Sequence, residues 1–480
     1  MAKKRILFVA GEGLPYVKSG GLADVVGSLP KALVAEGYEV NVVMPLYKSI
    51  INKFMQDLKL VGDFHLEVAS MDYPVRVFSD KQGKVTYYFI EHQGFFERDG
   101  LYGYDDDGAR YSFFQHAVLR MMYEFDDYYD IVHAHDWHTG MIPLLGKTIY
   151  SAFSKKFAKT KYVYTIHNLA FQGNFPADLL GTHLGLPYYF YENGELQFYN
   201  GISFMKAGIL FSEKVTTVSN TYSYEILTEA YGENMQHVLR SREHDLWGIV
   251  NGIDMEENNP ATDPLIAFNY DVDTLKDKVK NKTALQEQLG LRVAPDVCLV
   301  GMVSRLSWQK GVNLIIDKMR DIMGLDIQLV ILGTGESQYE YDLHQSENAY
   351  RRRMVFYGGY SNEIAHRIYA GADIFLMPSL FEPCGLSQLI SMRYGTLPIV
   401  RETGGLRDTV EPYNEYEKTG TGFSFTNFNG DEFFHVLKMA VNTYYLAPED
   451  FKMLQKNAMA RDSSWNASAK TYKRLYEYLD

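Results

Sequence analysis

Cysteine is almost absent from this chain of 480 residues, which has only Cys298 and Cys384. Two cysteines cannot make a disulfide framework, and they suit a reducing compartment. The sequence also lacks any apolar run long enough to span a membrane. Its first strand-like run begins almost at Met1, so we expect neither a signal peptide nor a transit peptide, and we predict a cytoplasmic protein.

Positive charge is scarce as well, because 47 Lys and Arg stand against 60 Asp and Glu, for a net charge of −13. This balance argues against a nucleic acid or an anionic membrane as the main partner, although it permits a local basic pocket. A complete dinucleotide-binding fingerprint is also missing. Gly11 and Gly13 follow the first strand without a third glycine or a ribose-binding acid, and "GTGE" at 333–336 is equally partial. A dehydrogenase is therefore disfavoured.

The chain does contain many short apolar runs that alternate with helical patterns. In the first half these runs are "RILFVA", "EVNVVMP", "VTYYFI", "DIVHAHD", "KYVYTIHN" and "KVTTVS", and in the second half "VCLVGMVSRL", "DIQLVILGTGE", "MVFYGG", "DIFLMPS" and "LPIVRE". Near-continuous apolarity predicts strands buried on both faces, hence parallel sheets covered by helices. Because the series restarts after "LWGIVNGID", we predict an α/β fold with two doubly wound domains, residues 1–250 and 251–460, and a terminal helix within 461–480.

Charged and glycine-rich signals follow the predicted strands. Ligands of open α/β sheets bind at the carboxyl ends of the strands. Lys18 follows the first strand, His167 follows "YVYTI", Arg305 and Lys310 follow "LVGMV", and Glu382 follows "DIFLM". This coincidence of position predicts a ligand-binding cleft more strongly than any one motif does.

Three of these loops suit anions or sugars. Lys18 with Gly20 and Gly21 resembles an anion-binding strand-to-helix turn, although glycine in such turns can serve chain geometry alone. Arg305 and Lys310 suit a diphosphate; the alternative is an ordinary exposed loop. In "PSLFEPCGLSQ" the amides of Cys384 to Ser387 could face a phosphate or sugar hydroxyls while Glu382 faces the sugar, and the alternative is a solvated turn.

Two clusters raise the question of a metal. "HAHDWHTG" and "TIHNLAFQG" contain several histidines, but core histidines with local hydrogen bonds are commoner than metal ligands. Asp136 and His167 stand at strand ends, where polar side chains can bind sugar hydroxyls. "YDDDGARY", with Asp105, Asp106 and Asp107, could hold a divalent cation or form a solvated loop before a helix. We favour the readings without a metal.

These motifs together resemble those of bacterial glycogen synthases, which are close relatives of plant starch synthases. The resemblance covers essentially the whole chain and includes the lysine–glycine–glycine loop, "HAHDWHTG", "TIHNLAFQG", "NGISFMKAG", "VNGID", "SRLSWQKG", "FYGGYS", "PSLFEPCGLSQL" and "ETGGLRDTV". The family fold is GT-B, two Rossmann-like domains facing across a deep cleft, with the final helix crossing back to the first domain. The activity that the resemblance implies is retaining transfer of glucose from ADP-glucose to the non-reducing end of an α-1,4-glucan such as glycogen or a maltooligosaccharide.

The resemblance also implies site residues, but no cofactor and no metal. Glu382, His167, Arg305 and Lys310 would be catalytic, with Glu382 at the reacting sugar and the two cations on the diphosphate. The implied substrate-binding residues are Lys18, Gly20, Gly21, Asp136, Asn251, Tyr360, Cys384, Gly385, Leu386, Thr403, Gly404 and Gly405. Tyr360 would stack near the adenine. Ile390 stands where many retaining GT-B enzymes have a second glutamate, so Glu382 would act without one.

Several alternatives stay open at this stage. The resemblance favours front-face displacement, but a double displacement through Glu382 is a second mechanism. A related enzyme using UDP-glucose, a retaining phosphorylase, or a catalytically weak glucan-binding regulatory protein are rival functions. Intact Arg305, Lys310 and Glu382 disfavour the inactive protein, and no motif indicates the lysine-bound cofactor of the phosphorylases.

Overall fold

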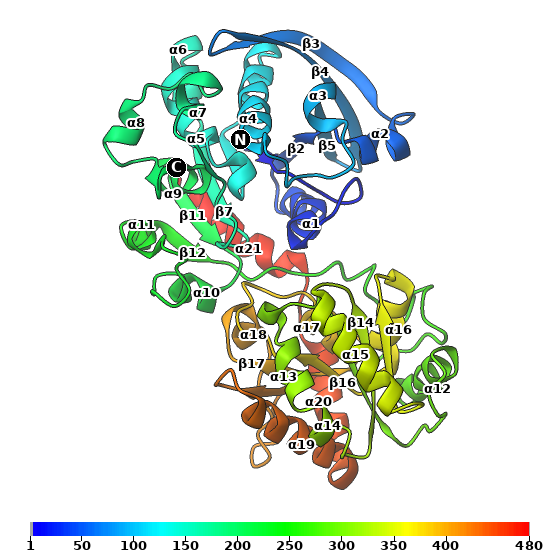
Figure 1. Ribbon diagram of the computed structural model, residues 1–480. Helices are drawn as coiled ribbons and strands as arrows, with labels where there is room; N and C mark the ends of the chain where they lie inside the picture. Colours follow the sequence, from blue (N-terminus) through cyan, green and yellow to red (C-terminus); the bar gives the residue numbers. More distant parts are fainter. Residues whose placement is uncertain (1–2, 480) are drawn as a thin grey trace. The chain divides into compact units, whose positions relative to one another are not determined.

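The structure is a computed structural model that describes residues 3–479. Within them the chain forms two compact units: the N-terminal unit, residues 3–251 with 465–479, and the C-terminal unit, residues 252–464. Each unit contains its own parallel sheet and its own hydrophobic core (Figure 1). The predicted α/β fold with two doubly wound sheets is confirmed. No helix within the described residues is both long and apolar enough to cross a membrane.

The N-terminal unit contains a nine-stranded sheet in the order β12-β11-β7-β6-β1-β2-β5-β4-β3. Its strands are β1 (Arg5–Val9), β2 (Glu39–Pro45), β3 (Lys59–Val68), β4 (Met71–Gln82), β5 (Val85–Glu91), β6 (Ile131–His135), β7 (Lys161–Ile166), β11 (Lys214–Thr217) and β12 (Leu246–Gly248). β1, β2, β5, β6, β7 and β11 are parallel, as their apolar runs predicted, and the short β12, which was not predicted, is parallel to β11. A small antiparallel sheet is formed by β8 (Asn174–Phe175), β9 (Gln197–Phe198) and β10 (Gly201–Ser203).

The hairpin of β3 and β4 was not predicted. β4 pairs antiparallel with β5, and β3 pairs antiparallel with β4 at the end of the sheet. Ala69 and Ser70 make the tight turn between them, both with positive φ. β3 alternates buried and exposed residues, with Phe64 and Leu66 turned to the core. Such a half-exposed strand lacks the continuous apolar run by which most of the parallel strands were predicted.

Helices cover the N-terminal sheet, and the last of them comes from the end of the chain. They are α1 (Gly21–Ala35), α2 (Lys48–Phe54), α3 (Gln93–Phe96), α4 (Asp107–Glu124), α5 (Ile142–Leu145), α6 (Ser151–Phe153), α7 (Leu179–Thr182), α8 (Tyr189–Glu192), α9 (Phe204–Phe211), α10 (Asn220–Glu225), α11 (Gln236–Arg240) and α21 (Trp465–Glu477). α21, red in Figure 1, packs against α1. Its buried face includes Trp465, Tyr472 and Tyr476, at the helical spacing that predicted this helix.

The C-terminal unit has a six-stranded parallel sheet in the order β15-β14-β13-β16-β17-β18. The strands are β13 (Cys298–Val303), β14 (Ile327–Gly333), β15 (Met354–Gly358), β16 (Ile374–Met377), β17 (Leu397–Arg401) and β18 (Phe423–Phe425). Its helices are α12 (Lys278–Gln288), α13 (Val312–Asp317), α14 (Met319–Ile322), α15 (Ser337–Ala349), α16 (Asn362–Gly371), α17 (Ser387–Arg393), α18 (Gly404–Thr409), α19 (Gly430–Leu446) and α20 (Pro448–Ala460).

The strand order locates the topological switch point of each sheet. In the N-terminal sheet the order runs outward from β1 in one direction and from β6 in the other. In the C-terminal sheet the corresponding pair is β13 and β16. Ligands of such sheets bind beyond the carboxyl ends of the strands at this point, so the loops after these four strands are the first place to look for a site.

Candidate active site

The predicted site residues follow the strands at the two switch points. Lys18 lies in the loop after β1, and Asp136 directly follows β6. In the C-terminal unit, Arg305 and Lys310 follow β13, and Glu382 follows β16. Each unit therefore presents a group of polar side chains where its topology predicts a ligand.

A buried carboxylate organises the loop after β1, and the sequence analysis missed it. Glu12 accepts hydrogen bonds from the backbone N–H groups of Ser19 (2.5 Å) and Gly20 (3.2 Å) and from the Tyr102 hydroxyl (3.0 Å). Burial raises the pKa of Glu12, and the hydrogen bonds from Ser19 oppose part of that rise. The N–H of Gly20, expected near a phosphate, is thus directed at a carboxylate of the chain itself. An acid placed shortly before a glycine-rich turn was the available signal.

Lys18 extends from the same loop. Its ammonium lies 2.8 Å from the carboxylate of Asp24 in the first turn of α1. Burial raises the pKa of Asp24, while the positive charge of Lys18 opposes the rise. The lysine side chain remains 44% exposed, so its ammonium can still reach an anion in solvent.

The histidines of β6 form a buried row that ends at His167. His133 and His135 stack with their ring centroids 4.2 Å apart. Nδ1 of His135 lies 3.0 Å from Nε2 of His167, and His133 contacts the hydroxyls of Tyr476 (2.8 Å) and Thr165 (2.6 Å). Burial lowers the pKa of all three imidazoles below the usual value. They are therefore neutral near pH 7, with His133 stacked on His135 and His135 hydrogen-bonded to His167.

Asp136 is held in an unusual backbone conformation beside this row. Its φ is +57°, a region that non-glycine residues seldom occupy outside turns and functional sites. Its carboxylate accepts from the backbone N–H of His167 at 2.7 Å. Burial raises the pKa of Asp136 to about 7, although the bonds from the amides of His167 and Asn168 oppose the rise. This carboxyl therefore changes its charge close to neutral pH.

Two other predicted features of the N-terminal unit have clear surroundings. Asn251 is buried, and among residues 3–479 its amide oxygen has no hydrogen-bond partner. The acidic triplet is engaged by arginines: Asp106 pairs with Arg98, and the buried Asp107 pairs with Arg110. Within the described chain, no three His, Cys, Asp or Glu side chains are grouped as a metal site.

An ion pair is the centre of the C-terminal group. The ammonium of Lys310 lies 2.5 Å from Oε2 of Glu382, which also accepts from the hydroxyl of Ser379 at 3.3 Å. Glu382 is 6% exposed. Backbone bonds hold the two loops together, since Leu380 donates to the carbonyl of Gln309 at 2.8 Å. Burying two charges is costly in solvation, and their close contact offsets part of that cost.

The loop after β17 packs directly on the Glu382 loop. The N–H of Gly405 donates to the carbonyls of Glu382 (3.1 Å) and Pro383 (3.2 Å). Gly404 has a φ of +45°, and a Cβ there would overlap the Glu382 carbonyl oxygen. Only glycine permits this approach. Thr403, Gly404 and Gly405 are thus brought next to Glu382 and the buried Cys384.

The start of α17 completes this group. Gly385 has a φ of +75°, which allows the chain to turn between Cys384 and the helix. Leu386 precedes the first residue of α17, Ser387. The amides of this turn lie at a helix N-terminus, where partial positive charge favours an anion or a hydroxyl oxygen.

Two further predicted residues of the C-terminal unit are exposed. The guanidinium of Arg305 has no ion pair or hydrogen bond among residues 3–479, and it lies in the loop just after β13. Tyr360, which follows β15, is 75% exposed. A free guanidinium suits a phosphate, and an exposed ring suits a flat base. The hydroxyl of Tyr360 donates to Oδ1 of Asn362 at 3.4 Å.

The chain matches family models over most of its length. Residues 5–241 match the starch synthase catalytic domain, and residues 287–458 match the glycosyl transferases group 1. Glycogen synthases from Clostridium perfringens and Caldicellulosiruptor saccharolyticus are each 46% identical over 475 residues, covering 99% of this chain and 98% and 99% of those proteins. The glycogen synthase from Streptococcus mutans is 45% identical and is covered completely.

Two solved structures are similar to the whole chain. The catalytic domain of starch synthase IV from Arabidopsis thaliana, bound to ADP and acarbose, is 32% identical with a TM-score of 0.92, over 100% of this chain and 99% of that one. Sucrose-phosphate synthase from Thermosynechococcus elongatus has a TM-score of 0.61 over 99% of both chains, and at 17% identity this likeness concerns the fold alone.

Proposed function

The chain belongs to the family of bacterial glycogen synthases and plant starch synthases, and from this premise we propose that it transfers glucose from ADP-glucose to the non-reducing end of an α-1,4-glucan. It has the GT-B fold of glycosyltransferases. As a member of this family it is a glucosyltransferase that elongates a glucan with a nucleotide-sugar donor.

The observation that most supports our assignment of the reacting centre is the Lys310–Glu382 ion pair. It lies at the switch point of the C-terminal sheet, after β13 and β16. A diphosphate leaving group needs positive charge, and an oxocarbenium-like sugar needs negative charge beside it. The pair presents one charge of each sign. We therefore assign Lys310 to the diphosphate and Glu382 to the sugar.

We assign the other donor contacts around this pair. Arg305 adds a guanidinium that can bind a phosphate with two parallel hydrogen bonds. Thr403, Gly404 and Gly405 would line the phosphates, and the amides from Cys384 to Leu386 would bind phosphate or sugar oxygens. Tyr360 would stack on adenine, which is the basis for ADP as the nucleotide. The ADP of the Arabidopsis structure supports this choice.

The polar residues of the N-terminal unit are assigned to substrate as well. Asp136, His167 and Asn251 would bind hydroxyls of glucose and of the acceptor, because neutral imidazoles and amides suit sugar hydroxyls. On the family resemblance, we assign Lys18 and the backbone at Gly20 and Gly21 to the donor phosphate. The acarbose of the Arabidopsis structure supports a glucan-like acceptor.

The mechanism that we propose is a front-face displacement with retention. The bond between glucosyl C1 and the phosphate oxygen breaks as the acceptor 4-hydroxyl approaches from the same side. The new bond joins C1 to the oxygen of the acceptor 4-hydroxyl, and the proton of that hydroxyl passes to the departing phosphate. Arg305 and Lys310 stabilise the growing phosphate charge, while Glu382 stabilises the sugar cation. A covalent glucosyl intermediate on Glu382 is the alternative.

An assay of product and donor tests this function. Purified protein with glycogen and ADP-glucose should release ADP and lengthen the glucan chains, and UDP-glucose should be the poorer donor. Faster turnover with UDP-glucose would contradict the assigned nucleotide while leaving the reaction intact. Absence of chain growth with both donors would identify a glucan-binding protein without activity.

From the two cysteines we also infer a cytoplasmic location.

A further inference from the structure

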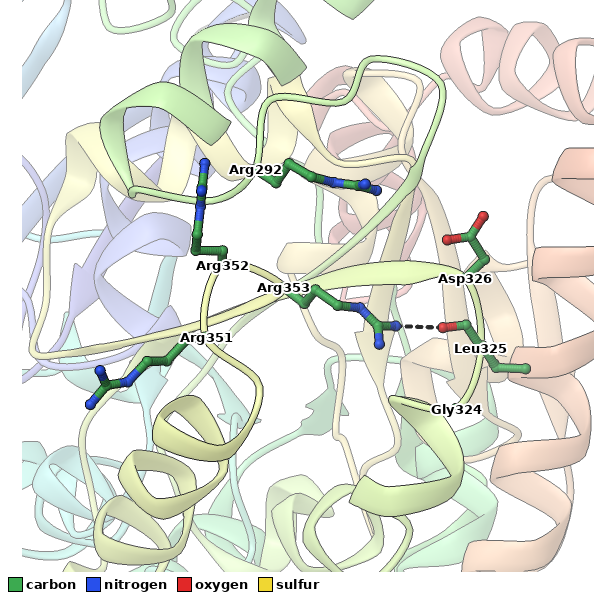
Figure 2. Close-up of a pocket in the computed structure, with 7 residues that line it drawn as sticks. All are labelled: Arg292, Gly324, Leu325, Asp326, Arg351, Arg352 and Arg353. Atoms are coloured by element: carbon green, nitrogen blue, oxygen red, sulfur yellow. Dashed lines mark hydrogen bonds between the residues drawn. The ribbon is translucent and has the colours of Figure 1, made fainter.

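A group of arginines lies at the amino ends of the strands of the C-terminal sheet. Arg292 precedes β13, Asp326 precedes β14, and Arg351, Arg352 and Arg353 precede β15. With Gly324 and Leu325 they line an open pocket of about 500 Å³ (Figure 2). Arg305 and Glu382 lie beyond the carboxyl ends of the same sheet. Since β14 has seven residues, the two ends of this strand are roughly 20 Å apart. The pocket is therefore separate from the proposed donor site.

Hydrogen bonds join the three loops that form this pocket. The N–H of Arg292 donates to the carbonyl of Arg352 at 2.9 Å. The guanidinium of Arg353 donates to the carbonyl of Leu325 at 2.7 Å, a bond that Figure 2 shows. Behind them, the buried amide of Gln328 donates to the carbonyl of Arg292 at 2.6 Å. The backbone of the pocket is therefore fixed before any ligand arrives.

The positive charges of the pocket are not balanced by the protein. Within residues 3–479 the side chains of Arg292, Arg351 and Arg352 form no ion pair and no hydrogen bond. Asp326 is the one carboxylate among the residues that line the pocket. In Figure 2, Arg292 and Arg353 extend in the same direction, towards Asp326, whereas Arg351 and Arg352 point in other directions. In a chain with a net charge of −13, such a concentration of cations is an exception.

The backbone at Arg352 also departs from the ordinary. Its φ is +64°, a conformation that costs a non-glycine residue free energy and that glycine or asparagine would adopt more easily. The turn before β15 thus has an arginine where the backbone geometry favours another residue.

We propose that the arginine pocket, with Arg292 and Arg353 as its binding groups, binds a small phosphate-bearing anion independently of the substrate site. Guanidinium groups match phosphate oxygens with paired, charge-assisted hydrogen bonds. Two of them on a fixed backbone suit a ligand with at least two negative charges. Because the pocket is open to solvent, binding weakens as salt screens the charges.

Titration calorimetry with inorganic pyrophosphate tests this pocket. Wild-type protein in buffer of about 50 mM salt, where screening is modest, should bind pyrophosphate at the pocket in addition to any binding at the donor site. Arg292→Ala should weaken the pocket binding about tenfold or more, as expected for one charge-assisted hydrogen bond. Arg353→Ala should do the same, whereas Arg352→Gly, in which glycine keeps the positive φ, should have less effect because that side chain points in another direction (Figure 2). Arg351→Ala removes an equal charge from the same loop but points away, so it should change the affinity less than about twofold.

Combining variants separates this site from the donor site. The double variant Arg305→Ala with Lys310→Ala should still bind pyrophosphate, and adding Arg292→Ala to it should abolish that binding. Equal weakening by Arg292→Ala and Arg351→Ala would indicate diffuse attraction and overturn the proposal. So would binding that disappears with Arg305 and Lys310 alone. Circular dichroism melts that match the wild type would show that the variants are folded.

Discussion

The two units present opposite chemistry at the same place in similar sheets. At the N-terminal switch point, His133, His135 and His167 are neutral because burial lowers their pKa, and burial raises the pKa of Asp136 to about 7. At the C-terminal switch point, Lys310 and Glu382 form an ion pair in which each side chain is less than 20% exposed. The difference teaches that the topology fixes where polar side chains gather, while the partner of each buried side chain distinguishes the neutral histidines from the ion pair.

The largest expected effect is on the charged side. Glu382→Ala should lower kcat about 10²–10³-fold with little change in donor affinity, because it removes a preorganised charge that acts mainly on the transition state. Steady-state kinetics with ADP-glucose would measure both quantities. Glu382→Gln keeps the shape and should be nearly as slow. Wild-type turnover in either variant would show that the ion pair is not the reacting centre.

The cations should come next in size. Arg305→Ala and Lys310→Ala should each lower kcat/KM for the donor about 10- to 100-fold, the range for a lost charge-assisted hydrogen bond. Arg474→Ala, which removes an exposed arginine from α21, should have little effect.

If Arg305 and Lys310 alone neutralise the diphosphate, activity should persist in excess EDTA. Loss of activity in EDTA with recovery in Mg²⁺ would instead point to the acidic loop, and Asp106→Asn would then mimic the loss.

Among the neutral histidines of the N-terminal unit we expect a smaller effect on activity, which His135 exerts through His167. Nδ1 of His135 lies 3.0 Å from Nε2 of His167, so we expect His135 to act as a positioning residue that fixes the tautomer of the His167 ring. His135→Phe should lower kcat about tenfold and shift its pH profile. His135→Asn keeps a polar atom near the place of Nδ1 and should recover part of the loss. Equal defects in both variants, with an unchanged pH profile, would mean that His135 only fills space.

Asp136 gives the comparison a pH dependence. With its pKa raised to about 7, the carboxyl is protonated below neutral pH, so activity that needs the carboxylate should fall several-fold between pH 8 and pH 6. Asp136→Asn should remove this fall in activity between pH 8 and pH 6.

The free energy of unfolding should change with pH in the opposite sense to activity. A raised carboxyl pKa stabilises the fold at low pH, and this stabilisation is lost as the pH rises from about 4 through 7. Melting of both proteins across this range checks the sign.

The smallest effect concerns the support of the histidine row. Tyr476→Phe removes the hydroxyl that lies 2.8 Å from Nδ1 of His133. We expect a loss of about 1 kcal/mol in the free energy of unfolding, the usual value for one hydrogen bond. Activity should change less than about twofold. A large loss of activity in folded protein would show that the row extends the site further than the contacts at His167 suggest.

Much of this arrangement could be predicted from local patterns. The apolar runs identified the parallel strands, and the residues after them, such as Lys310 and Glu382, were placed at strand ends before their contact was known. The β3–β4 hairpin was missed because its strands are half exposed. Glu12 and His135 were missed as functional groups because their importance comes from partners far along the chain, Tyr102 and His167. The arginine pocket was missed for the same reason, since Arg292 and Arg353 approach each other only in the folded sheet.

The return of α21 to the first unit has a consequence for synthesis on the ribosome. Domains generally fold as units during translation, the earlier one first. Here Tyr472 and Tyr476 fill the core around His133, so the first unit to be translated is the last to be completed. Until α21 has left the ribosome, that unit exposes an apolar seam along α1. Nascent chains halted before Trp465 should therefore depend on chaperones more than the finished protein does.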